Sequence, residues 1–419
     1  MKPRSPVWHP FTQHALQPEA IPIASGEGAW LETADGRRIF DAISSWWVVT
    51  HGHRHPHIVQ AIKDQTDRLD QVIFAGFTHE PAERLARLLV AMTPPGLDYV
   101  FFSDSGSTSV EVALKMALGF WRNRGERRSR ILALEGAYHG DTIGGMSVGE
   151  RGIFNAPYDP LLFDVERIPF PCEGREQATL DAITAACRNT GVAALIVEPL
   201  ILGAGGMLIY PAPVLAEMKR ICEAHGVLFI ADEVMTGWGR TGTLFACEQA
   251  GVTPDVACYS KGLTGGTMPL AVTLCRADIF DAHYSTDRGK TFFHSSSYTA
   301  NPIACAAACA NLEIWQREPV MERIAAVARA LTSGLDRFRE DRRFVNVRQI
   351  GTIAALDVVA DDAGYLAGIG PRLYEHFLSR GLLVRPLGNT IYLMPPYCST
   401  PQELDSVFDA ISEIADGIE

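Results

Sequence analysis

The sequence predicts an α/β protein, with a mainly parallel sheet in a large domain and a smaller α+β domain formed by both ends of the chain. Its 419 residues exceed the usual size of a single hydrophobic core. In the middle of the chain, short uninterrupted apolar runs alternate with helical or glycine-rich segments, as strands covered on both faces do. After about Ile314 the pattern changes to a long amphipathic stretch, followed by shorter strand and helix patterns.

The first part of the chain contributes a hairpin. Two runs, 29–32 and 38–41, are joined across a turn at Asp35 and Gly36, and Asp-Gly is a strong hairpin signal. We expect this hairpin to join the small domain. The expected ranges are 1–45 for the N-terminal part of the small domain, 46–313 for the large domain and 314–419 for the C-terminal part of the small domain.

Six apolar runs are expected to form the strands of the large sheet. They cover residues 99–102, 131–134, 194–197, 227–231, 256–258 and 270–274. In the C-terminal region, strands are predicted at residues 353–359, 382–385 and 391–394, and a helix at residues 374–380.

Two opposite charges follow two of these interior strands. Asp232 ends the run 227–231, and Lys261 follows the run 256–258. The carboxyl ends of strands line the ligand crevice of an open α/β sheet, so this acid and this amine could reach opposite ends of one ligand. A pyridoxal phosphate enzyme requires such a pair, with the lysine as the Schiff-base amine and the carboxylate at the ring nitrogen. The alternative is that Asp232 only caps or turns the chain.

Small hydroxyl residues and a glycine follow the first large strand. The segment 103–108 (Ser-Asp-Ser-Gly-Ser-Thr) precedes a run with helical periodicity. The free N–H groups at a helix start favour a phosphate at Gly106 and Ser107. The alternative is an ordinary helix cap, in which Thr108 and Glu111 form a capping box.

Other strand ends carry further candidates. Tyr138 could stack on a flat cofactor ring or serve simple packing, and Glu198 ends another strand. Arg240 could pair with a carboxylate through its guanidinium fork. Downstream, the hydroxyl cluster 295–297 could hold phosphate oxygens or form a Ser-rich turn.

Composition argues against several functional classes. A net charge of −12 without clustered Lys and Arg opposes a nucleic-acid surface. The nine scattered cysteines include no CxxC pair, which predicts reduced thiols. The start lacks the apolar core of a signal peptide and no run approaches about 20 apolar residues, so we expect a cytoplasmic protein outside the membrane. The four histidines in 51–57 have poor spacing for zinc, and no metal site is expected.

In chain order, these motifs resemble the class III, or ω-type, aminotransferases of the fold-type I pyridoxal phosphate enzymes. The resemblance covers nearly the whole chain and rests on residues 103–107, 138–141, 232–233, 239–242, 261–262 and 301–302. Further clusters are similar to the branch of this family that converts 8-amino-7-oxononanoate to 7,8-diaminononanoate in biotin synthesis, most often with S-adenosylmethionine as amino donor. Those clusters are residues 8–12, 44–47, 203–207, 263–266, 385–386 and 391–396.

The resemblance implies a role for each matching position. Lys261 would bind pyridoxal 5′-phosphate and carry the proton, Asp232 would pair with the pyridine nitrogen, and Tyr138 would lie against the ring and the substrate. Phosphate would be held by residues of both subunits of a homodimer: Gly106 and Ser107 from one, Ser296 and Ser297 from the other. The residues implied in the substrate pocket are Phe11, Trp46, Trp47, Tyr138, Lys261, Ser295, Arg385 as partner of the substrate carboxylate, and Tyr392, with Glu198 and Arg240 in support.

Three residues depart from the family pattern. Phe11 stands where the family often has Tyr, so the flat face is kept but a hydroxyl is lost. Because relatives that use lysine as donor can also carry Phe, lysine remains an alternative to S-adenosylmethionine. Ser295 and Ser296 replace a Gly-Pro pair found in some members.

Three other functions stay open at this point. The first is an ω-amino acid or diamine:pyruvate aminotransferase. The second is a non-catalytic pyridoxal-binding protein, which the intact pair of Lys261 and Asp232 argues against. A nucleotide-dependent dehydrogenase is weaker still, because no GxGxxG follows the first predicted strand.

Overall fold

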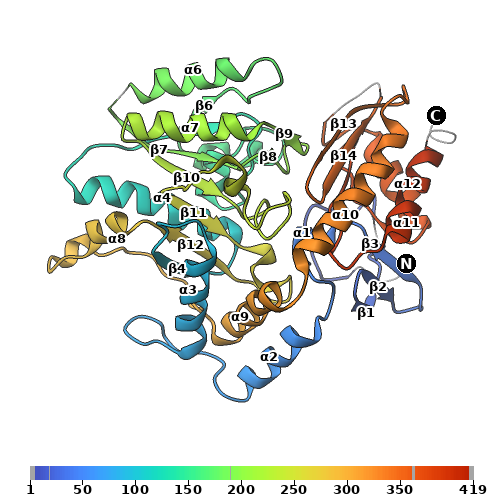
Figure 1. Cartoon of the computed structure of the whole chain (residues 1–419), viewed down its shortest axis with the longest axis horizontal. Helices are drawn as coiled ribbons and strands as arrows, with labels where there is room; N and C mark the ends of the chain where they lie inside the picture. The colour runs from blue at the N-terminus through green and yellow to red at the C-terminus, as the bar shows by residue number, and fades with distance from the viewer. Residues whose placement is uncertain (1–4, 18, 189, 361–363, 415–419) are drawn as a thin grey trace.

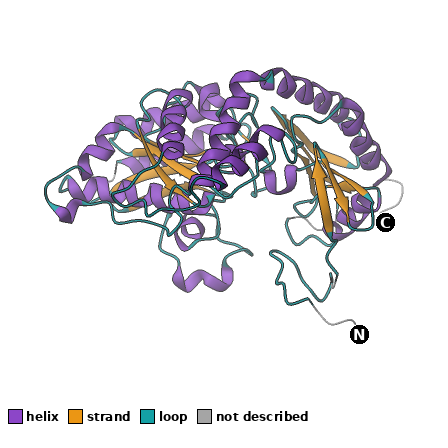
Figure 2. Ribbon diagram, turned by 90° about the horizontal axis from the view of Figure 1, so that it is seen from below, coloured by secondary structure: helices purple, strands orange, loops and turns teal. Residues whose placement is uncertain are grey.

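The computed structural model describes residues 5–17, 19–188, 190–360 and 364–414. It forms two bodies, each with its own sheets and helices (Figures 1 and 2). Among the described residues, no helix is long and apolar enough to cross a lipid bilayer.

The larger body is built around a seven-stranded sheet of order β4-β12-β11-β10-β7-β5-β6. The strands are β4 (Tyr99–Ser103), β5 (Arg130–Leu134), β6 (Glu166–Ile168), β7 (Val192–Val197), β10 (Leu228–Asp232), β11 (Val256–Tyr259) and β12 (Ala271–Cys275). From β11 to β6 all neighbours are parallel, whereas β12 is antiparallel to both of its neighbours. The mainly parallel sheet and its six predicted strands are confirmed. The sequence did not predict β6, a three-residue edge strand with two charged side chains.

Successive residues of the central strands face opposite layers of helices. In β10, Phe229 belongs to the core under helices α6 (Glu176–Cys187) and α7 (Ala212–Ala224), whereas Ile230 belongs to the core under α4 (Gly106–Asn123). Because both faces are covered, apolar residues are required at every position of these strands. This explains why the sequence shows continuous apolar runs instead of alternation.

The other helices before residue 318 lie around this sheet, beside α9 or next to the smaller body (Figure 1). They are α1 (Ser44–Trp47), α2 (Pro56–Thr66), α3 (Glu80–Met92), α5 (Ile143–Val148), α8 (Ala277–His283) and α9 (Pro302–Arg317). Helix α9 packs against both α2 and α3. It also spans the expected domain boundary at residue 313. A short hairpin, β8 (Ile201–Leu202) with β9 (Leu208–Ile209), follows β7.

The smaller body contains segments from both ends of the chain. The predicted N-terminal hairpin is confirmed as β2 (Trp30–Thr33) and β3 (Arg38–Asp41), preceded by β1 (Ile23–Glu27). The short strand β15 (Leu382–Leu383) adds to β3 in parallel, with Leu382 opposite Phe40. The pairing unites both ends of the chain in one sheet, as predicted, although β15 is shorter than the expected run 382–385.

A second sheet and three helices complete the smaller body. The sheet has the order β13-β14-β16, with β13 (Phe344–Ile350), β14 (Ile353–Val358) and β16 (Thr390–Leu393). The helices are α10 (Val320–Leu335), α11 (Ile369–Ser379) and α12 (Pro401–Ile414). Their apolar faces and those of β14 and β16 form one core. Helix α11 begins earlier than the predicted helix at 374–380.

Candidate active site

A cavity of about 730 Å³ opens where the carboxyl ends of β5, β7, β10 and β11 face the smaller body. This volume is typical of sites for small organic ligands. Most of the predicted site residues line it: Phe11, Trp46, Trp47, Gly106, Ser107, Tyr138, Glu198, Asp232, Lys261, Arg385 and Tyr392. The cavity therefore combines residues from the N-terminal segment, the large sheet and the C-terminal region.

Lys261 begins a 3-10 turn, η3 (Lys261–Thr264), directly after β11. Its φ of 46° is unusual for a residue with a side chain, and such backbone persists only where the surroundings hold it. Asn311 does so, because its Nδ2 donates to two carbonyl oxygens of this turn at 2.9 and 3.0 Å. The Lys261 amine lies 4.6 Å from the centre of the Trp47 ring. Burial lowers the pKa of Lys261 to about 8, against the opposing effect of the Asp232 charge.

Asp232 is the last residue of β10 and is only 5% exposed. Its Oδ1 accepts a hydrogen bond from the N–H of Val234 at 3.1 Å, and its Oδ2 lies 2.7 Å from Nδ1 of the buried His139. Sequence reasoning gave His139 no role, although the signal was present: it adjoins Tyr138 after β5. The contact orients the carboxylate, since two of its lone pairs are already used.

Glu198 and Tyr138 meet at the end of β7. The Glu198 carboxylate accepts from the N–H groups of Tyr138 and Gly203, both at 2.9 Å. Burial raises the pKa of Glu198 to about 7, so these two donors do not fully offset the loss of water. The Tyr138 hydroxyl donates to Asp141 at 2.9 Å. Burial, followed by the negative charge of Asp141, raises the pKa of Tyr138, which keeps this phenol protonated.

The first turn of α4 borders the cavity. Ser105 caps this helix in a capping box with Thr108, so a helix cap is present, but the alternative that Thr108 pairs with Glu111 is wrong. Glu111 instead accepts from the N–H of Gly144 at 2.6 Å, because its side chain reaches across to α5. A Cβ at Gly106 would lie 2.6 Å from a methyl carbon of Val234. The glycine therefore brings the positive end of an 18-residue helix against the cavity wall.

Aromatic rings surround the entrance of the cavity. The Phe11 ring centre lies 5.7 Å from Trp46 and 6.1 Å from Phe154, and Phe154 in turn lies 4.6 Å from Tyr365. The Arg385 guanidinium sits 5.5 Å from the Trp46 ring centre and donates to the Phe11 carbonyl oxygen at 3.0 Å. The entrance thus presents one cation among flat apolar surfaces, and sequence reasoning missed Phe154 and Tyr365.

Deeper in the cavity, Trp47 and Tyr392 form a buried pair. The indole Nε1 of Trp47 donates to the Tyr392 hydroxyl at 2.9 Å, and the two rings meet edge to face. This bond satisfies the indole, which would otherwise lose a hydrogen bond on burial.

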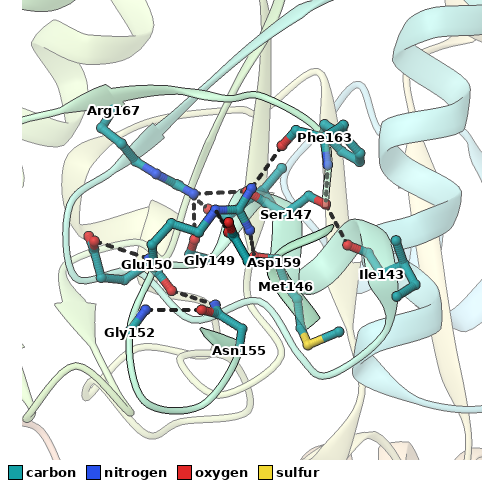
Figure 3. Close-up of polar contacts among 12 residues, drawn as sticks. Ile143, Met146, Ser147, Gly149, Glu150, Gly152, Asn155, Asp159, Phe163 and Arg167 are labelled. Carbon is teal, nitrogen blue, oxygen red and sulfur yellow. Dashed lines mark hydrogen bonds and ion pairs between the residues drawn. The ribbon is translucent and has the colours of Figure 1, made fainter. Parts of the chain in front are cut away.

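Phe154 lines the cavity and lies on the loop that follows α5. Figure 3 shows the polar contacts of this loop. Arg167 of β6 points into this region and donates to the carbonyl oxygens of Ser147 and Val148 at 2.8 and 2.7 Å. Next to Phe154, Asn155 closes the turn by accepting from the N–H of Gly152 at 2.9 Å and donating to the Glu150 carbonyl at 2.6 Å. These bonds hold Phe154 in place from its backbone side.

Two predicted groups lie elsewhere. Arg240 is fully buried and donates to the backbone carbonyls of Trp47, Val49 and Pro395, so the expected carboxylate partner is wrong. The Arg240 guanidinium instead links the segment of Trp47 to the C-terminal region. It supplies donors to buried carbonyl oxygens, which would be costly to leave unpaired. The hydroxyl cluster 295–297 lies on a loop before α9 and does not line the cavity of the same chain.

Comparisons with known proteins give one consistent result. The model of the family "Aminotransferase class-III" matches residues 12–415. An adenosylmethionine-8-amino-7-oxononanoate aminotransferase of Synechococcus elongatus is 50% identical, with 98% of this chain and 99% of the relative covered. The enzyme of that name from Geobacter sulfurreducens is 39% identical, with coverages of 98% and 95%.

Solved structures agree with this result. The crystal structure of an adenosylmethionine-8-amino-7-oxononanoate aminotransferase from Methanocaldococcus jannaschii has a TM-score of 0.93 at 34% identity, covering 98% of this chain and 97% of the other. An amine transaminase from an uncultivated Pseudomonas species, in its PLP-bound form, has a TM-score of 0.92 at 33% identity, with 98% of each chain covered.

Proposed function

Because this chain belongs to the class-III aminotransferase family and is a pyridoxal 5′-phosphate-dependent aminotransferase, we propose that it aminates 8-amino-7-oxononanoate to 7,8-diaminononanoate in biotin synthesis, with S-adenosylmethionine as donor. The names of the similar enzymes support this acceptor and donor. The observation that carries the proposal is a single cavity with Lys261 in its interior and Arg385 at its aromatic entrance.

The residues of the cavity fit the cofactor. Gly106, which leaves no room for a Cβ, and Ser107 at the start of α4 would hold the phosphate. Asp232, oriented by His139, would keep a proton on the ring nitrogen. When bound, pyridoxal phosphate supplies the aldehyde that takes up the amino group and a ring that accepts the electrons released on proton loss.

Lys261 would move the proton. Its pKa of about 8 leaves a useful fraction of neutral amine near neutral pH, and a neutral amine can accept a proton from the substrate carbon. The Trp47 ring beside the amine limits the directions in which the side chain can swing. Tyr138, with its phenol bound to Asp141, would form one wall for the planar cofactor.

Arg385 would bind the carboxylate at the far end of the acceptor. Its guanidinium uses one N–H on the Phe11 carbonyl and has others left for a carboxylate. The rings of Phe11, Trp46 and Phe154 offer apolar surface to the alkyl chain of the substrate. A nine-carbon oxo acid matches this combination of a long apolar passage and one terminal cation.

The proposal includes a homodimer with shared sites. Because Ser296 and Ser297 lie outside the cavity of their own chain, they would contribute to the phosphate site of the other subunit. The nine cysteines are free, and most are buried, which suits a reducing compartment. We accordingly place the enzyme in the cytoplasm.

A panel of substrates tests the proposed function. Purified enzyme is mixed with S-adenosylmethionine or lysine as donor and with 8-amino-7-oxononanoate or pyruvate as acceptor, and the aminated products are measured by mass spectrometry. We expect 7,8-diaminononanoate with S-adenosylmethionine. If 7,8-diaminononanoate forms with lysine and not with S-adenosylmethionine, lysine is the donor. If pyruvate is aminated and the oxo acid is not, the second candidate is favoured, an ω-amino acid or amine transaminase. The similarity to the Pseudomonas amine transaminase supports this candidate.

A further inference from the structure

The entrance of the cavity contains a phenol whose hydroxyl is not used by the folded chain. Tyr365 lies between β14 and α11, lines the cavity and packs its ring against Phe154. The other cavity phenols are engaged, since Tyr138 donates to Asp141 and Tyr392 accepts from Trp47. Within the residues that the structure describes, the Tyr365 hydroxyl has no hydrogen-bond partner. A half-buried phenol without a partner is available to a ligand.

The backbone brings this phenol to the end of the cavity that Arg385 occupies. Gly388, three residues after Arg385, has a φ of 64°, and a Cβ there would overlap the Gly364 carbonyl and lie 3.1 Å from Cα of Tyr365. The N–H of Gly364 also donates to Oδ1 of Asn389 at 3.2 Å. The segment of Tyr365 is therefore packed directly on the turn that follows Arg385.

Tyr392 lines the same cavity as Arg385 and Tyr365, and both of these side chains affect the pKa of its phenol. Burial is the main cause that raises the pKa of the Tyr392 phenol, while the Arg385 cation lowers this pKa and the Tyr365 phenol raises it. Both side chains therefore act on one buried hydroxyl at the wall of the cavity.

We propose that Tyr365 is a specificity-determining residue whose hydroxyl donates a hydrogen bond to the acceptor carboxylate held by Arg385. This inference rests on the proposed function and deepens it. A carboxylate has about four acceptor sites, and the guanidinium fork occupies at most two of them. A neutral phenol adds a donor without adding charge. An acceptor without the carboxylate leaves both the guanidinium and the phenol unpaired, and sites of this kind discriminate strongly.

The variant Tyr365→Phe isolates the hydroxyl, because it keeps the ring that packs on Phe154. We expect the KM for 8-amino-7-oxononanoate to rise about ten-fold, as for loss of a hydrogen bond to an ionised group. The kcat and the rate of the donor half-reaction should stay within about two-fold. The methyl ester of the oxo acid keeps only a neutral, weaker acceptor oxygen, so its kcat/KM should fall no more than about three-fold in the variant. The control is Tyr158→Phe, which removes the hydroxyl of a 49% exposed tyrosine that does not line the cavity.

The kinetics of Tyr365→Phe decide whether its hydroxyl binds the acceptor carboxylate. A ten-fold loss for the acid with a clearly smaller loss for the ester supports the assignment. An unchanged KM for the acid, or an equal loss for acid and ester, overturns it while leaving the proposed function intact. If the parent enzyme does not convert the oxo acid at all, the proposed function fails first and the inference fails with it.

Discussion

At the scale of single residues, burial makes Lys261 chemically different from a surface lysine. Its pKa of about 8 predicts that capture of added pyridoxal phosphate by cofactor-free protein becomes faster with pH, because only the neutral amine reacts. The second-order rate should rise about ten-fold from pH 6 to pH 7 and level off above about pH 9. Stopped-flow absorbance measures this rate. A rate that still climbs ten-fold per unit at pH 9 would show an ordinary lysine.

Arg385 offers a second test at this scale. Arg385→Ala removes the cation at the cavity entrance, so kcat/KM for 8-amino-7-oxononanoate should fall about 100-fold, in line with truncation of one partner of a desolvated charge pair. The donor half-reaction, followed by the cofactor absorbance, should change little. Arg380→Ala is the matched control, because Arg380 pairs with Glu413 on the surface. Equal damage to both half-reactions would remove Arg385 from the acceptor site.

Sequence reasoning located single residues well where strand ends position them. Lys261 and Asp232 were predictable because apolar runs mark interior strands, whose carboxyl ends meet in space. The contact of Asp232 with His139 could not be predicted from the sequence, because the prediction requires the strand order, in which only β7 lies between β5 and β10. The carbonyl partners of Arg240 come from distant parts of the chain, and no local pattern reports them.

At the scale of elements, the loop between α5 and β6 depends on Arg167. Its guanidinium bonds several carbonyl oxygens at the end of α5 (Figure 3). In Arg167→Met these carbonyls lose their donors, so we expect faster proteolytic cleavage in residues 149–164 and a KM for the oxo acid raised about three-fold through a less fixed Phe154. Limited proteolysis with mass spectrometry reports the cleavage site.

A control separates this effect from simple loss of charge. Arg175→Met removes an exposed arginine before α6. In this variant the loop 149–164 should be cut at the same rate as in the parent protein. If Arg167→Met is also cut at that rate, these hydrogen bonds do not hold the loop.

A helix or strand could be predicted where its own residues show the hydrophobic or turn pattern of that element. The six predicted strands of the large sheet and the N-terminal hairpin have such patterns. Strand β6 does not, because a short edge strand can be polar, and the run 382–385 gave only two paired residues, since Arg385 turns away to the cavity entrance.

At the scale of the whole molecule, the proposed dimer makes a complementation test possible. Lys261→Ala removes the amine from one site, and Ser296→Asp with Ser297→Asp would repel phosphate from the site of the other subunit. Each variant alone should be nearly inactive. After the two are mixed and subunits exchange, heterodimers contain one site free of both changes, so activity should return to about a quarter of the parent. Activity that does not return would show that each chain uses its own serines.

The most direct test of the account is to find where the cofactor is attached. Borohydride reduction of the enzyme with pyridoxal phosphate, followed by proteolysis and mass spectrometry, should yield one labelled peptide with the pyridoxyl group on Lys261, and Lys261→Ala should yield none. A label on another lysine, or an equally labelled Lys261→Ala protein, would contradict the central assignment of this cavity as the active site.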